Sequence, residues 1–156
     1  MKFPYLFLQY SSGGNASASD SADFSVRMTG ANYTDGAGEG YLQLFTRGQS
    51  TVNGSTTYMK IGQWYHICVV KNNADSTMKG YVNGNLEVTL NNPHKPVSDR
   101  PTVVGGLHST SGLYSVQGYY SNVRIQYTAL SASQVTTNAI NYEPLLSEQI
   151  NISEQI

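Results

Sequence analysis

The feature that most constrains the fold of this chain is an Asn-Gly pair between two strand-like runs. Asn83-Gly84 separates residues 78–82, rich in strand-forming residues, from residues 85–90, which alternate polar and apolar side chains. Asn and Gly tolerate the two positive φ angles of a type I′ turn, whose twist matches that of adjacent antiparallel strands. The segment therefore predicts a β-hairpin. Its second strand is expected to place three apolar side chains on one face, those of Leu86, Val88 and Leu90.

Further short strand signals run along the chain. The segment 64–70 is apolar on both faces, which is typical of a central strand packed on two sides. The apolar core of residues 1–8 is too short for a signal peptide, so we interpret this segment as a first strand. Other predicted strands are 24–28, 41–45, 102–104, 113–116 and 121–127. Short strands separated by frequent turns indicate a sandwich or jelly roll.

One helix is predicted near the C-terminus. Ser131-Ala132-Ser133-Gln134 has the pattern of a capping box, in which a Ser hydroxyl and a Gln side chain satisfy each other's backbone amides. A short helix over about residues 132–140 follows from it. We expect one domain over residues 1–141 and a tail or arm over 142–156, where Ser-Glu-Gln-Ile occurs twice. The spacing of the tail's isoleucines fits both a strand and a helix.

Composition excludes several classes of protein. Only 12% of the 156 residues are charged, about half the ~25% usual for soluble domains. Nine Lys and Arg balance ten Asp and Glu, and they form no basic stripe, so we expect no nucleic-acid partner. No apolar run approaches the ~20 residues that span a bilayer, so we expect no membrane insertion. The neutral, polar surface that remains is typical of virion-surface and extracellular proteins, which is where we expect this chain.

Four segments carry a resemblance to a known family. They are Gly62–Ile67 with its Trp-x-His pattern, the Tyr-x-Asn-Gly of Tyr81–Gly84, Asn122–Val135 and Asp23–Val26. Taken in chain order, from residue 23 to residue 135, they resemble the laminin-G-like, concanavalin-A-like lectin-glucanase jelly-roll superfamily. The resemblance implies an all-β, antiparallel β-sandwich (jelly roll) with one short helix near the C-terminus. It also implies structural roles for Trp64 and His66 in the core and for Asn83 and Gly84 in the hairpin turn.

Catalysis is not expected. Hydrolases of the superfamily carry a Glu-x-Asp-x-x-Glu cluster on one strand, and this sequence has none. Glycoside hydrolysis needs two carboxyl groups at a fixed separation of about 5–10 Å. The close acidic pairs here, Asp20/Asp23 and Asp35/Glu39, lie in segments rich in Gly and Ser, which are poor scaffolds for fixed geometry.

No cofactor is required on this interpretation, although Ca²⁺ is a candidate. Many superfamily members bind Ca²⁺ at the sandwich rim. Asp35 and Glu39, with Asn32 nearby, could supply the oxygen ligands that this cation prefers. The single Cys68 excludes an intrachain disulfide and a Cys-based zinc site, and we expect it to be a buried thiol.

Glycan binding by a jelly roll would use aromatic faces for sugar rings and amides or carboxylates for hydroxyls. Candidate residues for it come from loop-rich stretches: Tyr33, Asp35, Asn53, His108, Tyr114, Tyr119 and Tyr120. The alternative is that these tyrosines fill the sandwich and cover its edges.

Three functions follow in order of preference. The first is a non-catalytic recognition module displayed on a virion or outside a cell, which binds glycan. The second is a structural capsid or tail decoration protein that binds other protein chains, with the tail 142–156 as a route to a homo-oligomer. The third is a glycoside hydrolase.

Overall fold

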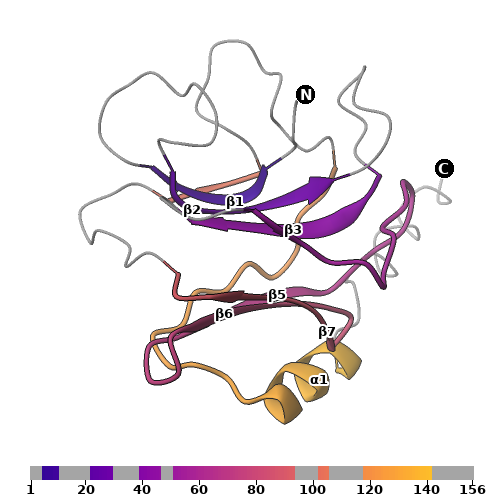
Figure 1. The fold of residues 1–156 in the computed structure, drawn as a ribbon. Coiled ribbons are helices and arrows are strands. Elements are labelled where there is room, and N and C mark those ends of the chain that lie inside the picture. The colour runs from indigo at the N-terminus through magenta and orange to yellow at the C-terminus, as the bar shows by residue number, and fades with distance from the viewer. Residues whose placement is uncertain are drawn as a thin grey trace, which may run out of the picture.

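The computed structural model describes residues 5–10, 22–29, 39–46, 51–93, 102–105 and 118–141. Two antiparallel sheets face each other as two layers, and the helix covers the outer side of the smaller sheet (Figure 1). The five-stranded sheet has the order β4-β3-β2-β1-β8, with β1 Tyr5–Tyr10, β2 Ala22–Thr29, β3 Tyr41–Thr46, β4 Val52–Asn53 and β8 Thr102–Val104. The three-stranded sheet has the order β5-β6-β7, with β5 Ile67–Asn72, β6 Thr77–Val82 and β7 Asn85–Asn91.

The core lies between these two layers, as the predicted sandwich requires. Alternate residues of each strand point inward, because successive side chains of a strand lie on opposite faces. The buried cluster takes Val26, Met28, Leu42 and Leu44 from the larger sheet and Met78, Val82, Val88 and Leu90 from the smaller one. Truncating such a side chain to Ala typically costs about 2–5 kcal/mol. The predicted fold class is confirmed.

The Asn-Gly turn forms as predicted. Asn83 has φ 50° and Gly84 has φ 83°, the left-handed values that a type I′ turn needs. The Asn83 side chain also reaches the segment before β5, since its Oδ1 accepts a hydrogen bond of 2.9 Å from the His66 N–H. The backbone N–H of Asn83 donates to the His66 carbonyl oxygen at 2.8 Å. The turn is therefore fastened to the neighbouring strand at two points.

Helix α1, Ala132–Ile140, begins at the predicted capping box. The Gln134 N–H donates to Ser131 Oγ, and the Ser131 N–H donates to Gln134 Oε1. Val135 is fully buried against Val70 and Tyr81 on the outer face of the smaller sheet. This contact buries the apolar side of the short helix, and α1 therefore packs on the outer face of the smaller sheet.

The predicted strand 64–70 is misplaced by three residues. β5 runs from Ile67 to Asn72, and Trp64 precedes it with 37% of its surface exposed. The prediction that Trp64 is a core residue is therefore wrong, while His66 is half-buried. β5 is also an edge strand among the described residues and not a central one.

Residues 121–127 are not a strand, although their alternation predicts one. They lie outside both described sheets, and Val123, Ile125 and Tyr127 are exposed. An alternating polar and apolar sequence shows only that a segment is suited to a sheet. It becomes a strand only where the backbone of a neighbouring strand pairs with it. The predicted strand 113–116 and the tail 142–156 lie outside the described residues.

A β-bulge in β7 changes the face on which one predicted core residue, Leu86, lies. Gly80 pairs with Val88, but Tyr81 pairs with Leu86, so Glu87 is the extra residue. The alternation shifts at this point, and Leu86 does not share the buried face of Val88 and Leu90 but is 52% exposed.

Among the described residues, no helix is long and apolar enough to cross a membrane.

The close contact between turn and helix generates a stability prediction. A Cβ on Gly84 would lie 3.0 Å from Thr136 Cα, whereas a Cβ on Gly62, which has a similar φ of 77°, would meet nothing within 4 Å. Gly62→Ala should cost only the left-handed strain, roughly 1–2 kcal/mol. Gly84→Ala should cost about 1–3 kcal/mol more, because the helix must move. Urea unfolding of both variants measures the difference, and equal losses would contradict this packing.

Candidate functional site

A short loop before β5 presents the single tryptophan of the chain. We call residues 60–65 the Trp64 loop. The hydroxyl of Tyr65 holds it together, accepting a hydrogen bond from the Lys60 N–H at 2.9 Å and donating one to Gln63 Oε1 at 2.7 Å. Gly62 supplies the left-handed residue that closes the turn. The loop is thus fixed by its own side chains.

The start of β3 gives this loop a second anchor. Glu39 Oε1 accepts a hydrogen bond of 3.2 Å from the Ile61 N–H. Next to it, Gly40 and Met59 exchange two backbone hydrogen bonds as an isolated bridge, and Met59 is buried in the core. The Tyr41 and Tyr58 rings meet edge to face, with centroids 5.3 Å apart. The loop is therefore attached to the larger sheet through the chain that leads into β3.

Apolar and polar groups stand side by side on the loop surface. Ile61 is 63% exposed, Trp64 is partly exposed, and Lys60 and Gln63 of the same loop are exposed. An indole ring offers a flat apolar face and one N–H donor, and a carboxamide offers both donors and acceptors. This combination suits a ligand that is apolar on its face and polar on its rim.

A carboxylate fixes the chain that leads into the loop. Glu87 of β7 accepts hydrogen bonds from the Thr57 N–H at 3.0 Å, the Thr56 N–H at 3.3 Å and the Thr57 hydroxyl. Gly54 allows the close approach, because a Cβ there would lie 3.2 Å from Glu87 Cβ. The segment after β4 is therefore bound to the opposite sheet.

Asn53, a predicted glycan-binding residue, lies exposed on the edge strand β4. Its Oδ1 accepts a hydrogen bond of 2.6 Å from Gln43 Nε2 on β3. The buried Arg27 guanidinium, opposite Gln43 on β2, lies 5.3 Å from the Phe45 ring centroid. The Asn53 amide thus extends a polar row across the outer face of the larger sheet.

The other predicted glycan-binding residues are not brought together by the described structure. Tyr119 is 88% exposed, and Tyr120 lies with its ring edge against Gly105 after β8. Burial of that hydroxyl end raises the pKa of Tyr120 to about 12. Tyr33, Asp35, His108 and Tyr114 lie outside the described residues.

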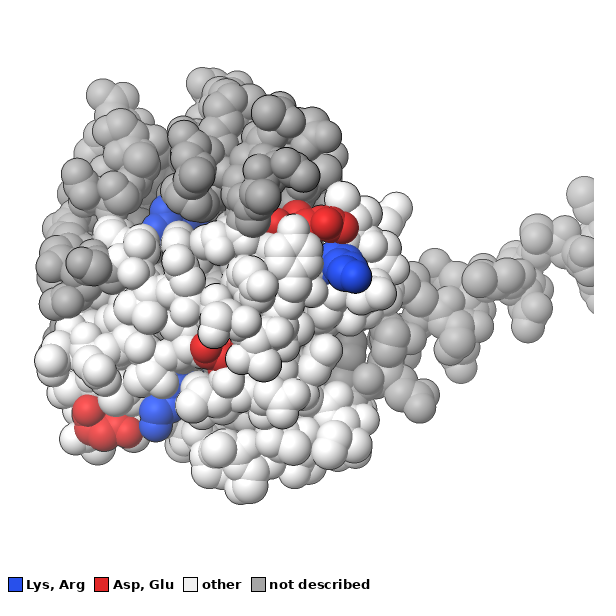
Figure 2. Space-filling view, turned by 45° about the vertical axis from the view of Figure 1, so that its right-hand side comes forward, with Lys and Arg blue, Asp and Glu red and all other residues white. Residues whose placement is uncertain are grey.

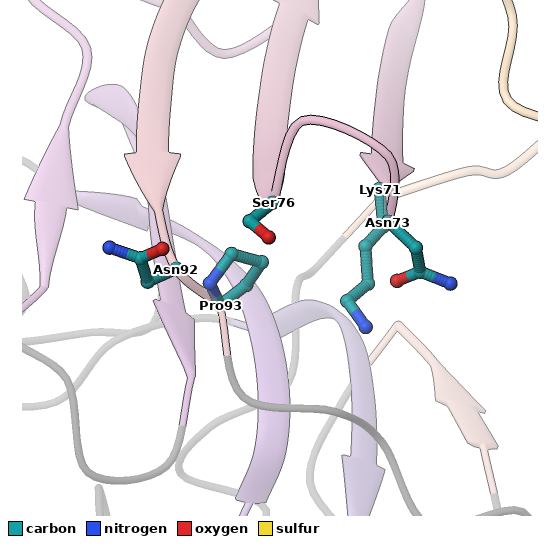
Figure 3. Close-up of a pocket in the computed structure, with 5 residues that line it drawn as sticks. All are labelled: Lys71, Asn73, Ser76, Asn92 and Pro93. Carbon is teal, nitrogen blue, oxygen red and sulfur yellow. The ribbon is translucent and has the colours of Figure 1, made fainter.

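An open pocket of about 400 Å³ lies at the far end of β5. Lys71 and Asn73 lie on one side of it, with Ser76, Pro93 and Asn92 across from them (Figure 3). On the face seen in Figure 2, the few charged side chains, in places an acidic one beside a basic one, are set in a surface of uncharged residues. This face is thus mostly uncharged, as the composition suggests.

The family follows from a match that covers most of the chain. Residues 6–136 match the model of the concanavalin A-like lectin/glucanases superfamily. The chain belongs to this superfamily. A heptameric SAP-like pentraxin from Limulus polyphemus has a similar structure, with a TM-score of 0.64 and 26% identity over 88% of this chain.

That similarity spans only 63% of the pentraxin chain. An S-layer domain-containing protein from Clostridium thermocellum aligns less well, with a TM-score of 0.45 and 18% identity over 88% of this chain and 63% of its own. No curated protein matches the chain.

The superfamily name covers both lectins and glucanases, so the placement of carboxylates matters. Glu39 and Glu87 bind backbone amides, and Asp75 accepts hydrogen bonds from the Thr77 hydroxyl at 2.7 Å and the Thr77 N–H at 3.2 Å. The hydrogen bond from the Thr77 hydroxyl is the main cause that lowers the pKa of Asp75. Within the described ranges, no three His, Cys, Asp or Glu side chains gather as a metal site. The predicted calcium ligand Glu39 supports the Trp64 loop.

His66 and Cys68 have structural surroundings in this superfamily member. Burial lowers the pKa of His66, so its imidazole is neutral at pH 7. Burial raises the pKa of the Cys68 thiol, which disfavours the reactive thiolate. Cys68 packs beside Val70 and Tyr81 under helix α1 and is half-buried.

The Trp64 loop is the candidate site that the sequence did not predict. A lone Trp among apolar residues suggests core packing. The signal that could have located it is Gly62, two residues before Trp64, because glycine is typical of turns and loops.

The hydrogen bonds of Tyr65 predict how the loop responds to their removal. Tyr65→Phe should lower the free energy of unfolding by roughly 1–3 kcal/mol, since two hydrogen bonds are lost. It should also raise acrylamide quenching of the fluorescence of Trp64, the only tryptophan. Tyr127→Phe is the matched control, because the Tyr127 side chain is fully exposed. Unchanged quenching in Tyr65→Phe would rule out this role.

Proposed function

We propose that this chain is a non-catalytic recognition module, displayed on a virion or outside a cell, that binds glycan through the Trp64 loop. The observation that carries the proposal is a partly exposed Trp64 next in sequence to Gln63, on a loop held by the hydrogen bonds of the Tyr65 hydroxyl and by the Glu39 carboxylate, which accepts from the Ile61 N–H.

The chemistry of the loop matches a sugar on two counts. A pyranose ring has a C–H face that packs on an aromatic ring, and hydroxyls at its rim that exchange hydrogen bonds with an amide. The loop is also ordered before it meets a ligand, which reduces the entropy lost on binding. A neutral surface suits a neutral ligand, because few charges must lose their water.

Membership of a superfamily that includes lectins supports a binding role. The similar pentraxin supports the sandwich as a scaffold for recognition, although the chain corresponds to only 63% of that protein. The proposal that the ligand is a glycan is based on the Trp64 loop. The proposal that the chain is displayed on a virion or outside a cell is based on its small number of charged residues.

A glycan array with the whole chain tests this function. Trp64→Ala should weaken binding to any glycan hit at least tenfold, about 1.4 kcal/mol, because the stacking face is lost. Tyr127→Ala removes an exposed aromatic ring outside the loop and should leave binding unchanged. Silence across the array, or equal binding by Trp64→Ala, would refute the proposal.

A protein partner is the second candidate function. Val123, Ile125 and Tyr127 are exposed along one segment, and contiguous exposed apolar side chains mark interaction sites. On this proposal the chain decorates a capsid, tail or filament, and copies associate through this segment or through the tail 142–156.

Light scattering after size-exclusion chromatography tests the second candidate. Ile125→Asp should abolish self-association if the exposed segment makes the contact, and deletion of residues 145–156 should abolish it if the tail does. Ile125→Asp should keep the free energy of unfolding of the parent chain within about 0.5 kcal/mol, since Ile125 is exposed. For the deletion, a cooperative urea-unfolding transition is the control that the domain still folds. A wild-type chain that remains monomeric at high concentration would exclude assembly with itself.

A further inference from the structure

The β6–β7 hairpin contacts the chain on both sides of the Trp64 loop. Before the loop, Glu87 Oε2 on β7 accepts hydrogen bonds of 3.3 and 3.0 Å from the N–H groups of Thr56 and Thr57. After the loop, Asn83 Oδ1 accepts a hydrogen bond of 2.9 Å from the His66 N–H. The Asn83 N–H donates to the His66 carbonyl oxygen at 2.8 Å. One hairpin therefore holds both ends of the stretch of chain that contains the loop.

The contact before the loop depends on a carboxylate at a β-bulge. Glu87 is the extra residue of the bulge in β7, and a bulge changes the direction of the side chain that it carries. Both carboxylate oxygens are used, since Oε2 accepts from two N–H groups and Oε1 accepts from the Thr57 hydroxyl. A carboxamide has one acceptor oxygen and a donor NH2 group, so it could not accept this whole set. The contact is therefore specific for a carboxylate.

The contact after the loop depends on the left-handed conformation of Asn83. Its φ of 50° is one that Asn tolerates better than most other residues with a side chain. Because Asn83 binds both backbone groups of His66, the direction of the chain at His66 is fixed. His66 directly follows Tyr65, whose hydroxyl makes the two hydrogen bonds that hold the loop together. A change at Asn83 would therefore be transmitted to the loop through His66.

We propose that Asn83 and Glu87 are positioning residues of the Trp64 loop, which set the orientation in which Trp64 faces a ligand. For the ligand, this inference rests on the proposed function. The hydrogen bonds of Tyr65 lie within the loop, so they cannot fix its orientation relative to the sheets, whereas the contacts to Glu39 and to the hairpin can. A binding group that is already held in place by surrounding hydrogen bonds loses less entropy when it binds. The affinity of the loop should therefore depend on two hairpin residues that lie outside it.

The fluorescence of Trp64, the only tryptophan, tests this role in the full chain. Glu87→Gln leaves one acceptor oxygen, and Asn83→Gly keeps the left-handed backbone but removes Oδ1. Each variant should raise the acrylamide quenching of Trp64 and should still unfold in a cooperative urea transition. Unchanged quenching in either folded variant would refute the role of that residue.

Two further variants separate positioning from a general loss of stability. Asp75→Asn is the matched control for Glu87→Gln, because Asp75 also accepts hydrogen bonds from a threonine N–H and hydroxyl, those of Thr77, but lies in the turn between β5 and β6. It should leave quenching unchanged, and a rise as large as that in Glu87→Gln would contradict the proposal. Asn83→Asp keeps an acceptor oxygen and should restore the quenching of the parent chain. If Glu87→Gln fails to fold, Thr57→Val removes only one of the hydrogen bonds of Glu87 and gives the same test.

Affinity for a glycan found on the array completes the test. Glu87→Gln and Asn83→Gly should weaken binding several-fold, whereas Asp75→Asn should bind like the parent chain. A glycan bound equally by the parent chain and by both hairpin variants would refute positioning but leave glycan recognition intact. A silent array would refute glycan recognition, and raised quenching would still support the positioning role, since quenching does not depend on the ligand.

Discussion

The Asn83-Gly84 turn is the constraint on which the smaller half of the molecule depends. Its two left-handed residues reverse the chain between β6 and β7. Asn83 then binds both backbone groups of His66 before β5, and the Gly84 carbonyl oxygen accepts a hydrogen bond of 3.2 Å from the Thr136 hydroxyl on α1. Because Gly84 has no Cβ, the helix backbone can approach the turn directly. Three segments distant in sequence are thus positioned by two residues.

Local chemistry explains why much of the fold could be predicted from the sequence. The hairpin and the helix start depend on residues within a few positions of one another, such as Asn83-Gly84 and the Ser131/Gln134 pair. The start of β5 depends instead on which neighbour pairs with it, and so the predicted strand began too early, at Trp64. The same reason explains residues 121–127, whose alternation predicts a strand that no described edge pairs with.

In the candidate site, too, the local chemistry could be predicted from the sequence, whereas the contacts between distant residues could not. The residue types for glycan recognition, aromatic rings and amides in a neutral surface, were evident from composition. Their placement was not, because the Trp64 loop depends on a hydrogen bond between Glu39 and Ile61, which are 22 residues apart. Glu39, a predicted calcium ligand, accepts the hydrogen bond from the backbone amide of Ile61. The pocket at Lys71 is also a product of packing, since its residues come from a turn and from the end of a distant strand.

The carboxylate of Glu87 has a consequence for the order of folding. It binds Thr56 and Thr57, which lie 31 and 30 positions before it in the sequence, while the hairpin that carries it closes over a two-residue turn. Short loops close at a smaller entropic cost and more rapidly than long ones. We therefore expect the hairpin to form before Thr56 and Thr57 bind to it, so that the chain leading into the Trp64 loop is positioned on a surface that already exists.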